Sequence, residues 1–122
     1  MNWTIALVAF VVAILVILLL KRLGQISPAT ARAYLADGAL VIDVRSPGEF
    51  ASGHLPIAIN IPLPEIEAGV PRRVADKSKV LLLHCQSGMR SGVACKKLKR
   101  LGYTNTFNLG SYARASQTVA PN

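Results

Sequence analysis

The chain has 122 residues, of which 52% are hydrophobic, and 14 basic against 6 acidic side chains give it a formal net charge of +8 at pH 7. This length leaves room for one globular domain and a short appendage, and it excludes two full-sized domains. The two cysteines and two histidines follow no metal-ligand spacing and no disulfide framework, so we expect neither a metal nor any other cofactor.

An apolar segment opens the chain. Residues 3–20 carry no charge, contain Thr4 as their one polar residue, and are followed at once by Lys21 and Arg22. About 20 apolar residues suffice for a helix to cross the hydrocarbon core of a bilayer, so residues 1–22 are predicted to form a transmembrane anchor. A cleaved signal peptide is the alternative, but its basic residues would precede the apolar stretch and a small-residue cleavage site would follow it.

The charges beside this segment predict its orientation. Lysine and arginine concentrate on the cytoplasmic side of membrane spans, and here they follow the apolar segment without preceding it. We therefore expect a single-pass membrane protein with Trp3 at the far interface and a globular domain, residues 23–122, that faces the cytoplasm. Cysteines stay reduced in that compartment.

Helices and short apolar strands alternate in the rest of the chain. Ser27 and Pro28 have the pattern of a helix start, and Gly38 ends that helix. Pro71 should end a short helical stretch near residues 64–68. Strands are expected at residues 39–44, 57–61, 80–84 and 106–109, with a turn-rich loop at 47–53. This alternation predicts an α/β domain with a mainly parallel sheet.

The segment 81–91 carries the chemistry. Its apolar strand ends at Cys85, and Gly88 and Arg90 follow before a helix begins. The backbone N–H groups of such a loop, together with the following helix N-terminus, produce a positive potential that lowers the pKa of a thiol and makes it nucleophilic. Cys85 is therefore predicted to be catalytic, and a cysteine that serves only as a small hydrophobic residue is the alternative.

Cys85-x-x-Gly88-x-Arg90-Ser91 resembles the active-site loop of the rhodanese family. The resemblance extends over residues 25–112 and implies a rhodanese-like three-layer domain with a mainly parallel sheet. Segments that are similar to the family, in the same order, are Val41-Ile42-Asp43-Val44-Arg45, Glu49-Phe50, Gly53-His54-Leu55-Pro56 and Ile59-Asn60-Ile61-Pro62.

The resemblance also implies a reaction. Rhodanese-like sulfurtransferases have six residues from the cysteine to the arginine of this loop, and related dual-specificity phosphatases need one more to hold a phosphate. Cys85 to Arg90 is six residues, counted inclusively. This implies an enzyme of the thiosulfate sulfurtransferase type, in which Cys85 takes a sulfane sulfur from an anionic donor such as thiosulfate, becomes a persulfide, and passes the sulfur to a thiol or cyanide. A tyrosine-phosphatase-like or arsenate-reducing activity is the less favoured alternative.

The residues around Cys85 are expected to bind anions. Backbone amides of the loop would stabilise the persulfide, and the side chain of Arg90 would bind the anionic donor. Arg45 follows the first strand and could steer anions toward the loop, although a local ion-pair cluster with Asp43 and Glu49 is the interpretation we favour. The expected anion-binding residues are Gln86, Ser87, Gly88, Met89, Arg90, Ser91 and Arg45.

Other chemically capable side chains are expected to be structural. His54 lies in a Gly-His-Leu-Pro turn, which favours a structural histidine over a general base. Cys95 lies on the apolar stripe of a helix, which favours a core residue over a resolving thiol. The helix ends in a basic cluster that we interpret as a solvated face, with contact to anionic lipid headgroups as the second hypothesis. Binding of nucleic acid is not expected, because no recognition motif accompanies the charge.

The C-terminal end departs from the family pattern. Asn108-Leu109-Gly110 matches it, but Ser111 replaces a second glycine and a usual tryptophan is missing from the residues that follow. We therefore expect a truncated final helix, or a disordered tail from about Ser116.

Two functions of different classes stay open. The first is a membrane-tethered sulfurtransferase that uses a small anionic sulfur donor and a thiol or cyanide acceptor. The second is a membrane-tethered persulfide carrier or docking module with little free turnover, which would serve a protein sulfur acceptor. In both, residues 3–20 contact the lipid bilayer. A thiol within a complete anion-binding loop favours the enzyme, because a docking module has no need for it.

Overall fold

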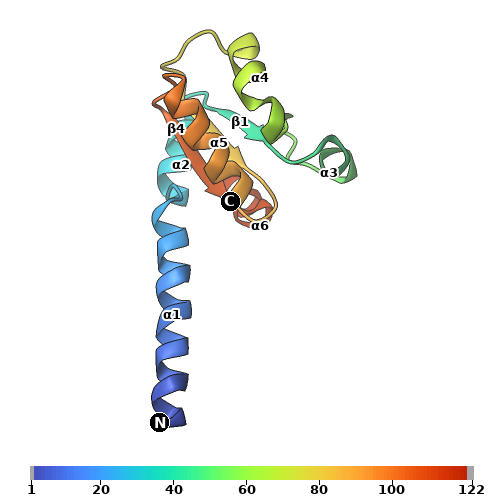
Figure 1. Cartoon of the computed structure of the whole chain (residues 1–122). Helices are drawn as coiled ribbons and strands as arrows, with labels where there is room; N and C mark the ends of the chain where they lie inside the picture. Colours follow the sequence, from blue (N-terminus) through green and yellow to red (C-terminus); the bar gives the residue numbers. More distant parts are fainter. Residues whose placement is uncertain (1, 121–122) are drawn as a thin grey trace.

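The computed structural model describes residues 2–120, except for the side chains of residues 21–23. A long N-terminal helix extends from a small domain in which helices cover a central sheet (Figure 1). The elements are, in chain order, α1 (Trp3–Leu23), α2 (Pro28–Ala36), β1 (Leu40–Asp43), α3 (Pro47–Ser52), β2 (Ala58–Asn60), a 3₁₀ turn (Leu63–Glu65), α4 (Ile66–Arg73), β3 (Leu81–His84), α5 (Met89–Arg100), β4 (Thr106–Gly110) and α6 (Tyr112–Val119).

The sheet has four parallel strands in the order β2-β1-β3-β4. All strands therefore end at the same edge, which is where open α/β sheets place their functional residues. The register between β3 and β4 shifts next to His84. Leu83 pairs with Asn108, but the next residue, His84, pairs with Gly110, so Leu109 is skipped. This irregularity lies immediately before Cys85.

Side chains of the strands alternate between two buried layers, which makes the domain three layers deep. Ile42 and Leu83 point into one hydrophobic cluster, which α4 and α5 cover. Val41 and Leu82 point into the other, which contains residues of α2 and α6. The structure thus confirms the expected α/β domain with a parallel sheet.

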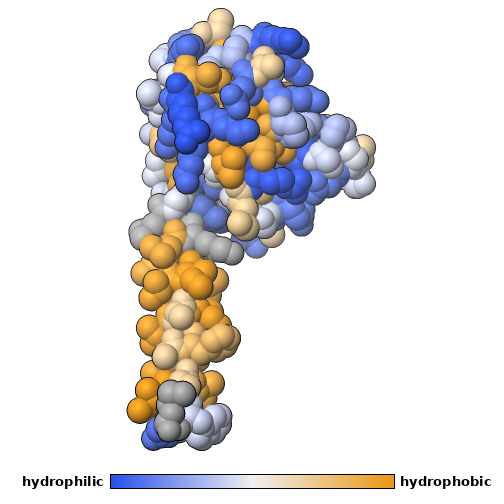
Figure 2. All heavy atoms as spheres, viewed as in Figure 1, coloured by the Kyte–Doolittle hydropathy of each residue, from blue (hydrophilic) through white to orange (hydrophobic). Residues whose placement is uncertain are grey.

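Helix α1 lies outside this core. The helix has 21 residues, and none of residues 3–20 is buried against the domain. Its surface is apolar along almost its whole length (Figure 2). By length and composition this segment could cross a membrane.

Two local predictions for residues 47–73 were wrong. The loop expected at 47–53 contains α3, because Pro47 occupies its first turn and the Ser46 and Glu49 side chains form a capping box. Pro71 does not end α4, which continues to Arg73. A proline in this position removes one intrahelical hydrogen bond, and the backbone N–H of Val74 still donates to the carbonyl of Val70 at 2.8 Å.

The C-terminal segment is also more regular than its sequence predicted. Helix α6 continues through Ser116 to Val119, so the expectation of a disordered tail is wrong for residues up to 120. Ser111, which replaces the usual glycine, is the N-cap and accepts a hydrogen bond from the N–H of Arg114 at 3.1 Å. Ala115 and Thr118 are buried, so packing holds the helix in place.

Candidate active site

Cys85 directly follows β3 and lies in a loop that curls around its sulfur. The N–H of Gly88 points at Sγ with a distance of 3.0 Å, and the hydroxyl of Ser91 lies 3.5 Å from Sγ. Gly88 has a φ of +93°, and a Cβ there would lie 3.2 Å from the Cα of Gly110. Glycine therefore serves both the backbone conformation and the close approach of β4. Helix α5 begins at the next residue, so its N-terminus also faces the sulfur.

These groups make Cys85 more acidic than an ordinary cysteine. Burial alone would raise its pKa, since the thiol is fully buried. The hydroxyl of Ser91 and the backbone N–H groups of Ser91, Gly88 and Ser87 act in the opposite direction and outweigh burial, so the pKa of Cys85 is lowered. An anion on this sulfur, whether thiolate or persulfide, is stabilised by the same N–H groups.

Arg90 forms a bidentate ion pair with Glu49. Its two terminal nitrogens lie 2.6 and 2.9 Å from the two carboxylate oxygens, and both side chains are about one-third exposed. This pair lowers the pKa of Glu49 to about 2, and the Ser46 backbone contributes in the same direction. The pKa of Arg90 is raised mainly by Glu49 and to a lesser extent by Cys85, so the pair lies near the reactive atom. The loop is thereby connected to α3.

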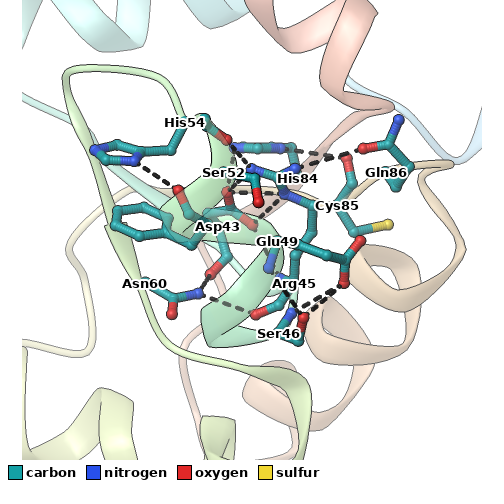
Figure 3. A network of polar contacts seen from close by, with 12 residues as sticks. Asp43, Arg45, Ser46, Glu49, Ser52, His54, Asn60, His84, Cys85 and Gln86 are labelled. Carbon is teal, nitrogen blue, oxygen red and sulfur yellow. Dashed lines mark hydrogen bonds and ion pairs between the residues drawn. The ribbon is translucent and has the colours of Figure 1, made fainter.

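Asp43 and Arg45 form another ion pair near the end of β1, and this one is buried (Figure 3). The carboxylate of Asp43 accepts hydrogen bonds from Nε, one terminal nitrogen and the backbone N–H of Arg45, at 2.8 to 3.0 Å. Arg45 also donates to the carbonyl of Gly53 at 2.7 Å and stacks on the ring of Tyr112. Glu49 was expected in this cluster, but its ion pair is with Arg90, because α3 turns its carboxylate toward the loop.

His84 lies between this pair and Cys85. It is fully buried, its Nδ1 lies 3.3 Å from the carbonyl of Cys85, and its Nε2 lies 3.7 Å from Asp43 without a hydrogen bond. Burial lowers its pKa, although the nearby carboxylate acts in the opposite direction. A neutral imidazole therefore fills this place, and it adds no positive charge beside the sulfur.

Asn108 organises the loop from β4, a role that the sequence did not reveal. Its Oδ1 accepts from the hydroxyl of Ser91 at 2.7 Å and from the N–H of Gly110 at 2.9 Å. Its Nδ2 donates to the carbonyl of Gly88 at 3.0 Å. All these contacts are buried, so Asn108 holds in place Ser91 and Gly88, the two residues that hydrogen-bond the sulfur of Cys85.

Comparison with known proteins agrees with this geometry. The sequence profile of the rhodanese-like domain matches residues 27–115. The chain belongs to the rhodanese-like domain family. It is 39% identical over 69 residues to thiosulfate sulfurtransferase PspE of Escherichia coli, a match that covers 57% of this chain and 66% of that protein. It is 37% identical over 95 residues to human thiosulfate:glutathione sulfurtransferase, which covers 66% of this chain and 83% of that one.

Solved structures give the same assignment. The human single-domain sulfurtransferase TSTD1 superposes with a TM-score of 0.65 and 31% identity over 80% of this chain and 98% of that chain. A rhodanese with anions from E. coli superposes with a TM-score of 0.61 and 35% identity over 63% of this chain and 91% of that chain. The chain spans about two thirds or less of the length of several curated relatives, 66% for the E. coli protein and 55% for YqhL of Bacillus subtilis.

Two other residues of this rhodanese-like domain, which the sequence predicted to be structural, pack against other side chains. His54 lies stacked on the ring of Phe50, and its Nδ1 lies 2.8 Å from the carbonyl of the same residue, away from the sulfur. Cys95 is buried in the hydrophobic core, and burial raises its pKa to about 12. The loop residues Gln86, Ser87 and Met89 are exposed, whereas Gly88 and Ser91 are buried.

The different environments of the two thiols predict selective alkylation. With iodoacetamide at pH 7 to 8, we expect one adduct per chain, at Cys85, measured by peptide mass spectrometry. The rate should fall as the pH is lowered through the pKa of Cys85, because only the thiolate reacts. The pH at which the rate is half maximal should lie below about 8.5, the usual pKa of a cysteine. Equal labelling of Cys95, or a midpoint above that value, would contradict the described environment.

Proposed function

We propose that this chain is a sulfurtransferase that carries sulfane sulfur on Cys85. The observation that carries the proposal is a thiol of lowered pKa that accepts a 3.0 Å hydrogen bond from the N–H of Gly88 at the start of α5. The match to relatives that are named thiosulfate sulfurtransferases supports the same reaction.

The chemistry follows from the loop. The thiolate of Cys85 attacks the outer sulfur of thiosulfate, a new S–S bond forms, and sulfite leaves with the electron pair of the broken bond. A thiolate or cyanide acceptor then attacks the outer sulfur of the persulfide, and the electron pair of that S–S bond returns to Cys85. Both steps place negative charge on sulfur inside the loop, where the backbone N–H groups stabilise it.

Arg90 is proposed to bind the anionic donor, and Glu49 to hold Arg90 in place until the donor arrives. Replacing Arg90 with alanine should raise KM for thiosulfate by about tenfold to 100-fold, since a charge-assisted hydrogen bond contributes about 1.5–3 kcal/mol. Alkylation of Cys85 by neutral iodoacetamide should change far less, because that reagent does not use the charge. Arg90→Lys is the matched variant that keeps the charge. A parallel loss of both reactions in Arg90→Ala would show that Arg90 only shapes the loop.

Steady-state kinetics test the proposed reaction. The full chain in detergent micelles should form thiocyanate from thiosulfate and cyanide, with parallel double-reciprocal lines when the two concentrations are varied, because the donor product leaves before the acceptor binds. Glutathione should replace cyanide as acceptor, in line with the name of the human relative. Absence of turnover from a folded protein with both acceptors would reject the enzyme and leave the persulfide carrier.

The carrier is the alternative function. It is favoured by the burial of Cys85, whose side chain has no exposed surface. A protein acceptor that opens the loop would then be needed to take the sulfur. Turnover with small thiols distinguishes the two functions.

The same proposal places the domain at a membrane. Residues 1–22 are proposed to be a single transmembrane anchor, and residues 23–122 a domain that faces the cytoplasm. The apolar, fully exposed surface of α1 supports the anchor, and the family match begins only at residue 27. The orientation rests on Lys21 and Arg22, which follow the apolar segment in the sequence.

A further inference from the structure

The segment that links α1 to the domain lies against the active-site loop. The side chain of Gln25 is close enough to Gly88 and Gly110 that a Cβ added at either glycine would lie 2.9 to 3.0 Å from its amide atoms. The N–H of Ile26 donates to the carbonyl of Asn108 at 2.9 Å. The carbonyl of Ile26 in turn accepts a hydrogen bond from Arg114 of α6. The loop around Cys85 is therefore fixed relative to the end of α1.

This contact places the active-site loop near the bilayer surface if α1 is the proposed anchor. The apolar stretch ends at Leu20, three helical residues before the end of α1, and Gln25 follows two residues later. Three helical rises of about 1.5 Å and two extended residues of about 3.5 Å bring Gln25 to at most about 12 Å beyond the hydrocarbon core. The headgroup layer itself is about 5–8 Å thick on each side. Gly88 lies next to Gln25, so the loop lies within this layer or a few Å beyond its outer edge.

Exposed apolar side chains and a lysine lie on this side of the loop. Met89 and Val93, on successive turns of α5, are 66% and 47% exposed. With Lys96 one turn further along, they line a shallow cavity of about 210 Å³ that Gln25 closes on the other side. We call Gln25, Ser87, Met89, Val93 and Lys96 the linker-side patch.

Figure 1 agrees with this placement. In Figure 1, α6 lies on the side of the domain from which α1 extends. The end of β4 thus lies on the side of the domain from which α1 extends.

We propose that the linker-side patch rests on the anionic surface of the bilayer that α1 spans. This inference rests on the proposed anchor and extends it from a tether to a defined orientation of the active site. Met89 and Val93 would turn their apolar side chains into the headgroup layer. Lys96 would pair with lipid phosphate.

The bilayer fits this patch better than a protein partner does. The patch is continuous with the anchor through Gln25, so docking on lipid needs no further element. Its charge is positive and the chain carries a net charge of +8, which complements anionic headgroups. Cys85 would then meet its acceptor in the headgroup layer, and thiols presented at a membrane would be the preferred substrates.

Fluorescence quenching in vesicles tests the proposal with the full chain. Trp3 is the single tryptophan, so Trp3→Phe provides a background in which Met89→Trp reports on the patch. Thr104→Trp is the matched control, because Thr104 is exposed at the opposite edge of the sheet, just before β4. The vesicles contain phosphatidylcholine and phosphatidylglycerol with a spin label on the headgroup. We expect strong quenching in the Met89→Trp chain and little in the Thr104→Trp chain.

Lys96→Glu, added to Met89→Trp, should lower the docked population relative to the undocked one by at least about fivefold, since each lysine near an anionic surface contributes about that factor. Equal quenching of Met89→Trp and Thr104→Trp chains, with both variants folded by circular dichroism, would overturn the proposal.

The native Trp3 separates this failure from failure of the anchor. In the unmodified chain, Trp3 should be quenched by the same lipids whether or not the patch docks. A chain with quenched Trp3 and an unquenched Met89→Trp signal spans the bilayer but holds its active site away from it, which rejects the inference alone. Loss of both signals rejects the anchor as well.

Discussion

Replacing Cys85 with serine should abolish sulfur transfer, with kcat/KM for thiosulfate lowered by at least about 10³-fold. A hydroxyl in this loop has a pKa far too high to be ionised by the N–H of Gly88, and it cannot form a persulfide. The fold should be retained, because serine replaces sulfur with oxygen at a position where hydrogen-bond donors already converge. Activity is measured as thiocyanate formation, and folding by circular dichroism.

Cys95→Ala is the matched control for this substitution. Cys95 is buried in the core on α5, and its raised pKa keeps it protonated at neutral pH. We expect its replacement to leave kcat/KM within about twofold of the original value, at a cost of about 1 kcal/mol in stability. If Cys95→Ala abolished transfer and Cys85→Ser did not, the assignment of the nucleophile would be wrong.

The largest loss of stability is expected for Asp43→Ala. Arg45 is 5% exposed, and the carboxylate of Asp43 is its ionic partner and accepts three of its N–H groups. Removal of one member of a buried pair leaves the other charge without compensation, which costs about 3–5 kcal/mol. The free energy of unfolding in urea should fall by this amount, as measured by circular dichroism on the chain in detergent micelles.

Two further variants show whether the unpaired charge is the cause. Glu67→Ala removes an ion pair with Lys97 that is largely exposed, and it should cost at most about 1 kcal/mol. In an Asp43→Ala chain, Arg45→Met should restore part of the lost stability, because no charge is then buried. If Asp43→Ala cost no more than Glu67→Ala, the pair would not stabilise the domain.

The architecture could be predicted from the sequence because its signals are local. Apolar runs between turn and cap residues predicted the four strands to within a residue. The errors were local as well. Helix α3 was not predicted, because the capping box of Ser46 and Glu49 lies in a segment rich in proline and glycine. Ser111 was interpreted as a missing glycine, whereas it is the N-cap of α6.

The site could be predicted only in part, because its long-range contacts have no local signature. The loop from Cys85 to Ser91 stood out, since its residues are adjacent in the sequence. The partner of Glu49 did not, because Arg90 is 41 residues away and α3 sets the direction of the carboxylate. Asn108 and Gln25 reach the loop from β4 and from the linker, where nothing in the sequence marks them as part of a site.

The most direct test of sulfur transfer through Cys85 is the intact mass of the protein after incubation with thiosulfate, followed by cyanide. We expect the unmodified chain to gain the mass of one sulfur atom and to lose it when cyanide is added, and the Cys85→Ser chain to gain nothing. A folded, unmodified chain that gains no sulfur, or a Cys85→Ser chain that gains it equally, would contradict a persulfide on Cys85.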